Sequence, residues 1–389
     1  MTAGIQEFRP TIIVALVSDQ PVSTITPALD PEFRPEQVIL VQSPKFAAQA
    51  DWIEKVLQPA GIHVTRCRLD NYWEIEPIRD RMLDLLAEHE HDAIALNVSG
   101  GSKVMSLAAY EVFRSADKPV FYVQPDTDEL LWMYPHRRPG HQLADHIKLK
   151  AFVLAHGAEV TALHKTAIPE RQRTLTRQLV EHVEALQGPL RALNWYAHQA
   201  GDLESPPLSA RHLKQGTAFD ALATRFEQEG FLQRKDRRLV FPDEHSRFYV
   251  NGGWLEEHVF SVVYGLRGQL DEIQDIARSV EIVRYQRSNP VRNELDVAFL
   301  ANNKLYIVEC KTRHFPDSAG EEHSAGAETI YKLDTLKELL GGLHGRAMLV
   351  SYGEFSRFDR QRASDLEIET CIGKEITSLE SRLRRWISG

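Results

Sequence analysis

The segment 294–312 constrains the fold most, because it reads as two apolar strands joined by a tight turn. Asn302-Asn303 separates the two runs, and asparagine tolerates the positive φ that a two-residue hairpin turn requires. A turn centred there places Asp296 opposite Glu309. Directly opposed side chains lie about 5 Å apart, and like charges in that position destabilise a sheet. The pairing therefore predicts a cation between these two acids.

The second strand of this hairpin carries its charges at one end. Alternation puts Glu309 and Lys311 on one face, behind apolar residues, and Cys310 on the other. Both faces are mostly apolar, which is typical of an interior strand. Converging carboxylate oxygens suit Mg²⁺ or Mn²⁺. The alternative is an ordinary cross-strand ion pair between Lys311 and Glu294, which the same register sets opposite each other.

An acid on one strand and Glu-x-Lys on the next resembles the PD-(D/E)XK restriction-endonuclease-like nucleases. Asp296 matches the first acid of their motif, Glu309 the second and Lys311 the lysine, while Leu295 stands where the motif has proline. The resemblance implies metal-dependent phosphodiester cleavage, in which the carboxylates hold the metal and the lysine orients the attacking water.

The same family adds an acid on the helix before the hairpin, and the segment 252–259 supplies two candidates. Helical spacing puts Glu256 at the edge of an apolar stripe and points Glu257 away from it, so we expect Glu256 to join the site. His258 is expected to be a packing or surface residue. The candidate metal ligands are Glu256, Asp296, Glu309 and Cys310, although the Cys310 side chain is expected on the opposite face.

The first 150 or so residues alternate strands with amphipathic helices, which predicts a doubly wound, mostly parallel sheet. The expected strands are Thr11–Ser18, Gln37–Gln42, Ile62–Leu69, Asp92–Val98 and Val120–Gln124. The expected helices are Phe46–Gln58, Ile75–Glu88 and Val104–Arg114.

Two polar loops follow strands of this sheet, where such folds bind ligands. One contains Ser18, Asp19 and Gln20. The other leads straight into a helix, so that its backbone N–H groups and side chains suit a phosphate; it contains Asn97, Ser99, Gly100, Gly101, Ser102 and Lys103. Each loop alone also fits a merely structural turn.

Together the two loops resemble those of the CRISPR-associated Rossmann-fold (CARF) domains, and the whole chain resembles the CARF-nuclease effectors of type III CRISPR systems. This resemblance implies a homodimer in which both loops bind a cyclic oligoadenylate, commonly cyclic tetra-adenylate, that switches on the nuclease. The implied parts are a Rossmann-like CARF sensor over residues 1–160, a linker over 161–248 and a nuclease domain over 249–389.

The linker is less informative. A helix is expected over Glu170–Leu186, another over Ala218–Gln228, and a hairpin over Phe231–Phe241. A helix followed by a hairpin suggests a winged helix whose basic residues contact DNA phosphates. These basic residues are Arg234, Lys235, Arg237 and Arg238. The alternative is a spacer or a dimer scaffold.

Composition favours a cytoplasmic enzyme with no membrane segment. The 389 residues carry a net charge of −9 and only three scattered cysteines, which excludes a disulfide framework and a broad nucleic-acid-binding surface. The expected activity is an activated endonuclease that cleaves RNA, single-stranded DNA or duplex DNA. The alternatives are a restriction-type nuclease that senses another nucleotide and a non-catalytic regulator that binds DNA.

Overall fold

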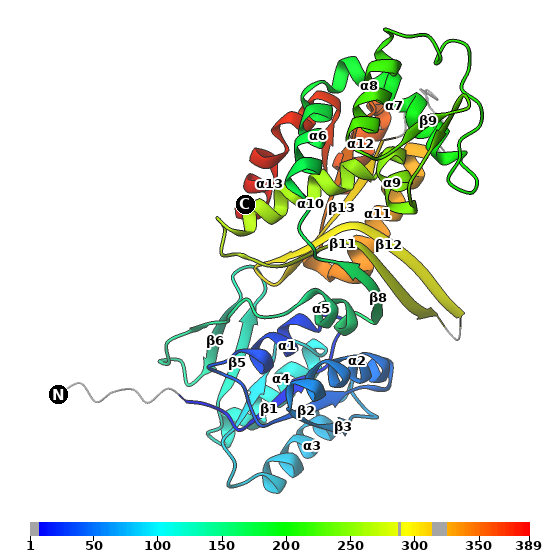
Figure 1. Ribbon diagram of the computed structural model, residues 1–389. Coiled ribbons are helices and arrows are strands. Elements are labelled where there is room, and N and C mark those ends of the chain that lie inside the picture. The colour runs from blue at the N-terminus through cyan, green and yellow to red at the C-terminus, as the bar shows by residue number, and fades with distance from the viewer. Residues whose placement is uncertain (1–7, 287–288, 313–324) are drawn as a thin grey trace, which may run out of the picture.

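The computed structural model describes residues 8–286, 289–312 and 325–389. In Figure 1 the N-terminal sheet and its helices lie at the bottom, and the second sheet lies above them with the remaining helices. Within the described ranges, no helix combines the length and the apolar character needed to cross a bilayer.

The first sheet of the described chain has seven strands: β1 (Ile12–Leu16), β2 (Gln37–Gln42), β3 (His63–Arg68), β4 (Ile94–Asn97), β5 (Val120–Gln124), β6 (Glu129–Tyr134) and β7 (His141–Gln142). Their order is β3-β2-β1-β4-β5-β6-β7. Neighbours among β1 to β5 are parallel, and β6 and β7 extend one edge antiparallel. The predicted doubly wound, mostly parallel sheet is therefore confirmed.

Helices cover both faces of this sheet: α1 (Val22–Leu29), α2 (Ala47–Leu57), α3 (Ile75–Glu88), α4 (Lys103–Ser115) and α5 (Leu149–Ala155). β1 is buried on both sides, which explains its continuous apolar sequence. Ile13 and Ala15 join the apolar cluster of α1, α2 and α5. Val14 and Leu16 join the cluster of α3 and α4 on the other face.

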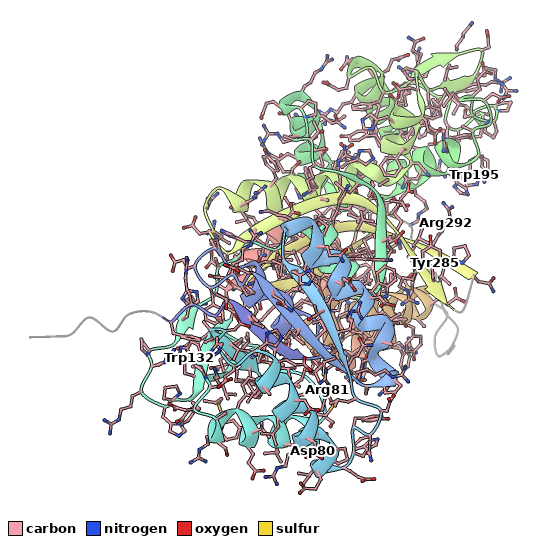
Figure 2. All side chains as sticks on the ribbon, turned by 90° about the horizontal axis from the view of Figure 1, so that it is seen from below. Asp80, Arg81, Trp132, Trp195, Tyr285 and Arg292 are labelled. Carbon is pink, nitrogen blue, oxygen red and sulfur yellow. The ribbon has the colours of Figure 1, made fainter. Side chains whose placement is uncertain are left out.

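The second sheet of the described chain has six strands: β8 (Ala158–His164), β11 (Ile273–Gln286), β12 (Asn289–Ala301), β13 (Lys304–Lys311), β14 (Arg346–Ser351) and β15 (Ile368–Ile372). Their order is β15-β14-β13-β12-β11-β8. β13, β14 and β15 are parallel, and the other pairs are antiparallel. The far end of β11 and β12 projects as an arm, on which Figure 2 labels Tyr285 and Arg292.

The helices of this half are α6 (Glu170–Glu181), α7 (Val183–His198), α8 (Ala218–Gln228), α9 (Glu244–Phe248), α10 (Trp254–Arg267), α11 (Ala325–Gly341), α12 (Arg357–Asp365) and α13 (Leu379–Ser388). Buried side chains of α10 and α13 pack on one face of the sheet. Those of α11 pack on the other, in a cluster that continues through α5 into the first sheet. The two halves are thus joined by apolar packing.

The linker differs from its prediction in two respects. The single helix expected over Glu170–Leu186 is two helices, α6 and α7, which meet at His182. Buried residues of α6, α7 and α8 share one cluster with α10 and α13, so the linker has no separate core. The predicted helix Ala218–Gln228 is confirmed, as is the hairpin, whose strands are β9 (Gln233–Lys235) and β10 (Arg238–Val240).

Two further boundaries bear on the predicted domains. β8 pairs with β11 and therefore spans the proposed sensor boundary at residue 160 as part of the second sheet. The C-terminal segment of the nuclease half begins as a 3₁₀ turn, η5 (Gly373–Ser378), and continues as α13.

Candidate functional site

The β12–β13 hairpin has the predicted register, with Val297 paired to Val308. Asn302 and Asn303 adopt positive φ, 48° and 50°, as a two-residue hairpin turn requires. The paired ladder ends at Val297. Beyond it, Asp296 Oδ2 accepts a 2.7 Å hydrogen bond from the backbone N–H of Cys310, so the first acid is tied directly to the strand that carries the second.

The Lys311 ammonium occupies the place between the two acids. Its Nζ lies 2.5 Å from Glu309 Oε1 and 4.0 Å from Asp296 Oδ2. Glu309 is only 4% exposed, so its charge has little access to water and needs a neighbouring cation. The cation predicted from the opposed carboxylates is, in this structure, the lysine of the same motif. Lys311 contacts Glu309 and Asp296 rather than forming the alternative ion pair with Glu294.

The Gly252-Gly253 pair lets the start of α10 approach the end of β13. Gly252 has φ +114°, and a Cβ there would lie 2.0 Å from Thr312 Oγ1. A Cβ on Gly253 would lie 2.2 Å from the Phe248 ring. Only glycine fits these two positions without rearrangement. They place the first turn of α10, and with it Glu256, beside the hairpin acids.

The pKa values of Glu256, Asp296 and Lys311 are shifted by one another's charges, which shows that these side chains lie close together. Burial, followed by the charges of Asp296 and Glu294, raises the pKa of Glu256 well above its ordinary value. Burial and the charge of Glu309 raise the pKa of Asp296 to about 7. Burial alone would lower the pKa of Lys311, but Glu309 and Asp296 outweigh it and raise that pKa. The structure therefore brings Glu256, Asp296, Glu309 and Lys311 together, as the sequence predicted.

The carboxylates offer the hard oxygen donors that Mg²⁺ and Mn²⁺ prefer, and the raised pKa values mark a site short of positive charge. In the conformation described, no group of three or more His, Cys, Asp or Glu side chains in the described ranges is gathered as a metal-binding set. The Lys311 ammonium offsets part of this negative charge in the conformation described.

Cys310 is the candidate ligand whose side chain does not fit. Its thiol belongs to the apolar cluster on the α10 face, with Val308 and Val350. Burial and the nearby carboxylates raise the pKa of this thiol well above its usual value, which disfavours the thiolate needed to bind a metal. Only its backbone N–H takes part, through Asp296.

Glu257 points away from these acids, as expected, but toward the protein interior. It is 1% exposed and accepts a short hydrogen bond from Gln172 of α6. Burial is the main cause that raises its pKa to about 7. The prediction missed this burial because α6 covers the face of α10 that spacing alone assigned to solvent.

Asn194 of α7 is a supporting residue that sequence reasoning missed. We orient the Asn194 amide so that its nitrogen faces acceptors and its oxygen faces a donor. The nitrogen then donates to the backbone oxygens of Val250 at 2.9 Å and Leu190 at 3.1 Å. Its oxygen then accepts from Thr312 Oγ1 at 3.1 Å. Asn194 therefore links the linker to the residue after Lys311. A polar residue on an apolar helix face was the only signal in the sequence.

The two polar loops of the first sheet meet at its switch point. β1 pairs with β2 on one side and β4 on the other, so the strand order reverses between β1 and β4. A Cβ on Gly100 would lie 2.0 Å from Leu16 O and 3.2 Å from Ser18 Oγ. Gly101 has φ +77°. The glycines therefore allow the loop after β4 to pack against the loop after β1.

Several polar residues of these loops hold the loops together. Asn97 donates to Ser23 O at 2.8 Å and accepts from the backbone N–H of Ser99 at 3.0 Å. Ser99 Oγ accepts from Val123 N at 2.8 Å. Ser102 caps α4 by accepting from the N–H of Met105.

The other candidates in these loops face outward. Asp19 and Lys103 are exposed, and Lys103 is the first residue of α4. Exposed polar groups and a helix N-terminus at a switch point suit an anionic ligand. The structure thus brings all nine candidate residues of the two loops to one edge of the sheet.

The wing of the linker is partly neutralised. Arg234 contacts Asp220 at 2.6 Å and Glu227 at 2.8 Å, and Arg238 donates to Ser205 O at 2.7 Å. Lys235 and Arg237 remain in the group of candidate phosphate contacts. The wing therefore has fewer cations to offer DNA than its sequence suggests.

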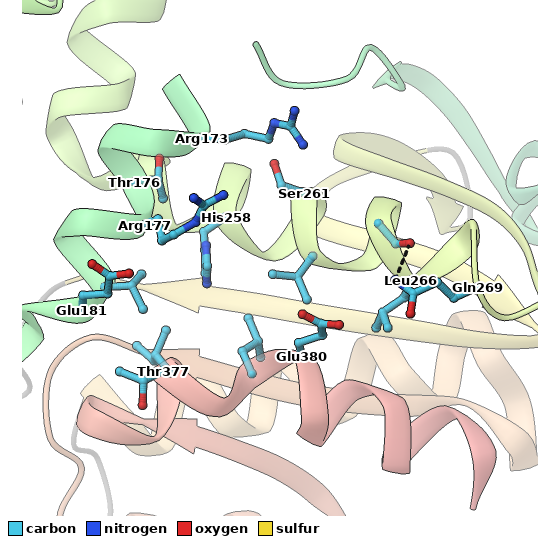
Figure 3. Close-up of a pocket in the computed structure, with 15 residues that line it drawn as sticks. Arg173, Thr176, Arg177, Glu181, His258, Ser261, Leu266, Gln269, Thr377 and Glu380 are labelled. Atoms are coloured by element: carbon cyan, nitrogen blue, oxygen red, sulfur yellow. Dashed lines mark hydrogen bonds between the residues drawn. The ribbon is translucent and has the colours of Figure 1, made fainter. Parts of the chain in front are cut away.

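A separate cleft of about 410 Å³ lies between α6, α10 and η5–α13. Figure 3 shows Arg177 beside His258 on its upper side and Glu380 below. Burial and the charge of Arg177 lower the pKa of His258 to about 4, so this histidine is neutral at pH 7. The cleft is separate from the site described above, because Glu256, Asp296, Glu309 and Lys311 do not line it.

Fold and sites together define a Rossmann-like ligand-sensing domain joined to a nuclease domain. The family model of the Card1 CARF domain matches residues 12–152, and that of the Card1-like endonuclease domain matches residues 243–388. The chain therefore belongs to the CARF-domain nucleases. No curated protein matches the sequence significantly.

Solved structures with the same architecture cover nearly the whole chain. Protein VC1899 from Vibrio cholerae is 29% identical with a TM-score of 0.87, over 97% of this chain and 98% of that one. Can2 from Sulfobacillus thermosulfidooxidans, in complex with cyclic tetra-adenylate, is 25% identical with a TM-score of 0.80, over 97% and 99%. A type III CRISPR defence DNA nuclease activated by cyclic oligoadenylate shares the fold at 18% identity and TM-score 0.55, over 90% of this chain and 46% of that one.

Proposed function

We propose that this protein is a cytoplasmic, homodimeric endonuclease of type III CRISPR antiviral defence. In this proposal a cyclic oligoadenylate, of which cyclic tetra-adenylate is the first candidate, activates metal-dependent cleavage of nucleic acid. The observation that carries the proposal is the convergence of Glu256, Asp296, Glu309 and Lys311 in a chain whose sensor loops meet at the switch point. The likeness to Can2 with its bound cyclic tetra-adenylate supports the choice of activator.

Glu256, Asp296 and Glu309 would hold Mg²⁺ or Mn²⁺. A divalent cation bound there supplies Lewis-acid activation of the scissile phosphodiester. Lys311, which contacts Glu309 in this structure, would have a second role beside the bound substrate. It orients the attacking water and offsets the charge that develops on the phosphate as the P–O bond breaks.

The activator would bind across the two-fold axis of the dimer at the loops of Ser18–Gln20 and Ser99–Lys103. Ser102 and Lys103 present the N-terminus of α4, whose free N–H groups attract phosphate. In a closed two-fold dimer, a two-fold ligand binds once per pair of chains.

The decisive experiment incubates the protein with Mn²⁺, each cyclic oligoadenylate in turn, and labelled RNA, single-stranded DNA or supercoiled DNA. We expect cleavage of at least one substrate that requires both the metal and one ring size. Excess EDTA and the Asp296→Asn variant serve as negative controls. Activity that persists in EDTA contradicts the metal site, and activity indifferent to every cyclic oligoadenylate favours the restriction-type nuclease that senses another nucleotide.

Absence of cleavage together with specific DNA binding would favour the non-catalytic regulator. The complete set of three acids and a lysine argues against it, because a protein without catalytic function has no need to keep buried like charges together.

A further inference from the structure

A cavity of about 190 Å³ lies where the sensor meets the nuclease half of the chain. Its sensor side comes from the loops after β1, β4 and β5. Its nuclease side comes from the β12–β13 turn and a short 3₁₀ turn, η4 (Gly342–His344), after α11. The residues on which the argument rests are Gln20, Ser99, Tyr122, Lys304, Leu343 and His344.

The cavity adjoins the proposed activator loops. Gln20 and Ser99 belong to those loops and also line the cavity. The Gln20 amide touches the nuclease half, since a Cβ on Gly342 would lie 2.8 Å from Gln20 Oε1. A ligand seated on the loops therefore meets η4 and the hairpin turn as well as the sensor.

Size and lining suit one nucleotide of a larger ligand. Pockets that enclose whole drug-sized ligands measure about 300–1,000 Å³, so this cavity is too small for an entire cyclic oligonucleotide. Tyr122 offers an aromatic surface, and Leu343, 81% exposed, extends the apolar rim. Lys304 adds a positive charge, and His344 adds an imidazole whose pKa is lowered by burial and by the charge of Lys304. Both face Asp126: Lys304 Nζ donates to its backbone oxygen at 3.0 Å, and His344 Nδ1 lies 3.9 Å from its carboxylate.

We propose that one nucleotide of the activator enters this cavity and that Lys304 and His344, both in the nuclease half, contact it directly. The inference rests on the proposed function and adds to it a part of the activator site contributed from outside the CARF domain. Asp126 lies beside both side chains at the cavity wall. A phosphate is a stronger acceptor for Lys304 than a backbone carbonyl, so the lysine transfers to the activator.

Lys304 and the proposed nuclease site lie at opposite ends of one strand, β13. Lys304 is the first residue of β13, and Lys311 is the last. The neighbouring Asn303 is 3% exposed and donates to Asp128 Oδ2 of the sensor at 3.3 Å. One strand, at about 3.3 Å per residue, thus runs from the activator cavity to the nuclease site.

The test is calorimetric titration of the full-length protein with cyclic tetra-adenylate, without metal or substrate. Lys304→Glu should raise the Kd on the order of tenfold or more, because it places a carboxylate against a phosphate. His344→Ala should raise it by a smaller factor. The matched control is Lys374→Glu, the same charge change at an exposed lysine of η5 outside the cavity, which should bind like the wild type.

The outcomes separate this inference from the proposed function. If the wild type does not bind cyclic tetra-adenylate, this inference fails together with the choice of cyclic tetra-adenylate as activator in the proposed function. If the wild type binds and folded Lys304→Glu has a Kd within twofold of it, the inference is overturned while the proposed function stands. Should Lys304→Glu unfold, Lys304→Met keeps the chain length and removes the charge, and it should still bind at least about threefold more weakly.

Discussion

At the scale of single residues, the nuclease site is an excess of negative charge held by packing. Three carboxylates, one buried and two half-buried, lie around one ammonium, that of Lys311. Burial is the largest cause of the raised pKa values of Glu256 and Asp296, so the fold resists their ionisation. The divalent cation of the proposed function would relieve this excess of negative charge.

Replacing either hairpin acid should abolish cleavage without unfolding the protein. We expect Asp296→Asn and Glu309→Gln each to lower kcat about a hundredfold or more, because each removes a metal ligand. Stability should be unchanged or slightly higher, since one of several crowded charges is lost. Cleavage assays with activator and Mn²⁺, together with urea unfolding, check both parts. Full activity in either variant would remove the carboxylates from the mechanism.

The raised pKa of Asp296 also predicts how stability depends on pH. Its pKa is about 7 in the folded chain, against an ordinary value of 3.8, so the folded state binds the extra proton. The stabilisation is complete below about pH 4 and is lost as the pH rises through 7. Without divalent metal, the unfolding free energy of the wild type should fall between pH 5 and pH 8 by on the order of 1 kcal/mol more than that of Asp296→Asn. Equal pH dependence of the two proteins in urea would refute the shift.

At the scale of elements, the site depends on how α10 begins. The turn η3 (Tyr249–Gly253) leads into α10, and Gly252 lies against Thr312 at the end of β13. Asn194 joins the same contact from α7. The approach of helix and strand, rather than either element alone, sets Glu256 beside the hairpin acids.

Gly252→Ala should therefore damage both folding and catalysis. An alanine there takes a strained φ and meets Thr312, which should cost about 1–3 kcal/mol of stability and displace Lys311. The matched control is Gly265→Ala in the same helix, where a Cβ meets nothing within 4 Å. That change should stabilise the helix by about 0.5–1 kcal/mol and keep activity. Unfolding curves and cleavage rates of both variants decide the matter; equal effects would exclude a special role for Gly252.

Elements with clear local periodicity were predictable, and those that depend on distant partners were not. The alternation and the Asn302-Asn303 turn sufficed for the hairpin and its register. The single helix expected over Glu170–Leu186 missed the break at His182 and the continuation of α7 to His198, where the helix is held by tertiary packing. β8 was missed because its partner β11 is more than a hundred residues away and its own pattern is only partly apolar.

At the scale of the whole molecule, the residue sets were recognisable from sequence, but their connection was not. The sensor loops and the nuclease motif were each found as local patterns. The contacts between the two halves involve Asn303, Lys304 and η4. No local sequence pattern marks these contacts, because the partners lie far apart in the chain. The apolar cluster shared through α5 makes that contact firm enough to transmit a change in one half to the other.

A change in the sensor loop should therefore alter regulation and leave the nuclease site intact. Lys103→Glu places a carboxylate at the exposed N-terminus of α4, where the activator phosphates are proposed to bind. It should raise the activator concentration needed for half-maximal cleavage by about tenfold or more, while the rate at saturating activator approaches that of the wild type. Lys118→Glu, at a half-buried lysine beyond the other end of the same helix, is the control. In wild-type titrations we expect one cyclic ligand per two chains, since a two-fold site closes on a single two-fold ligand. A stoichiometry of one per chain, or a Lys103→Glu variant as sensitive to activator as the wild type, would place the activator site elsewhere.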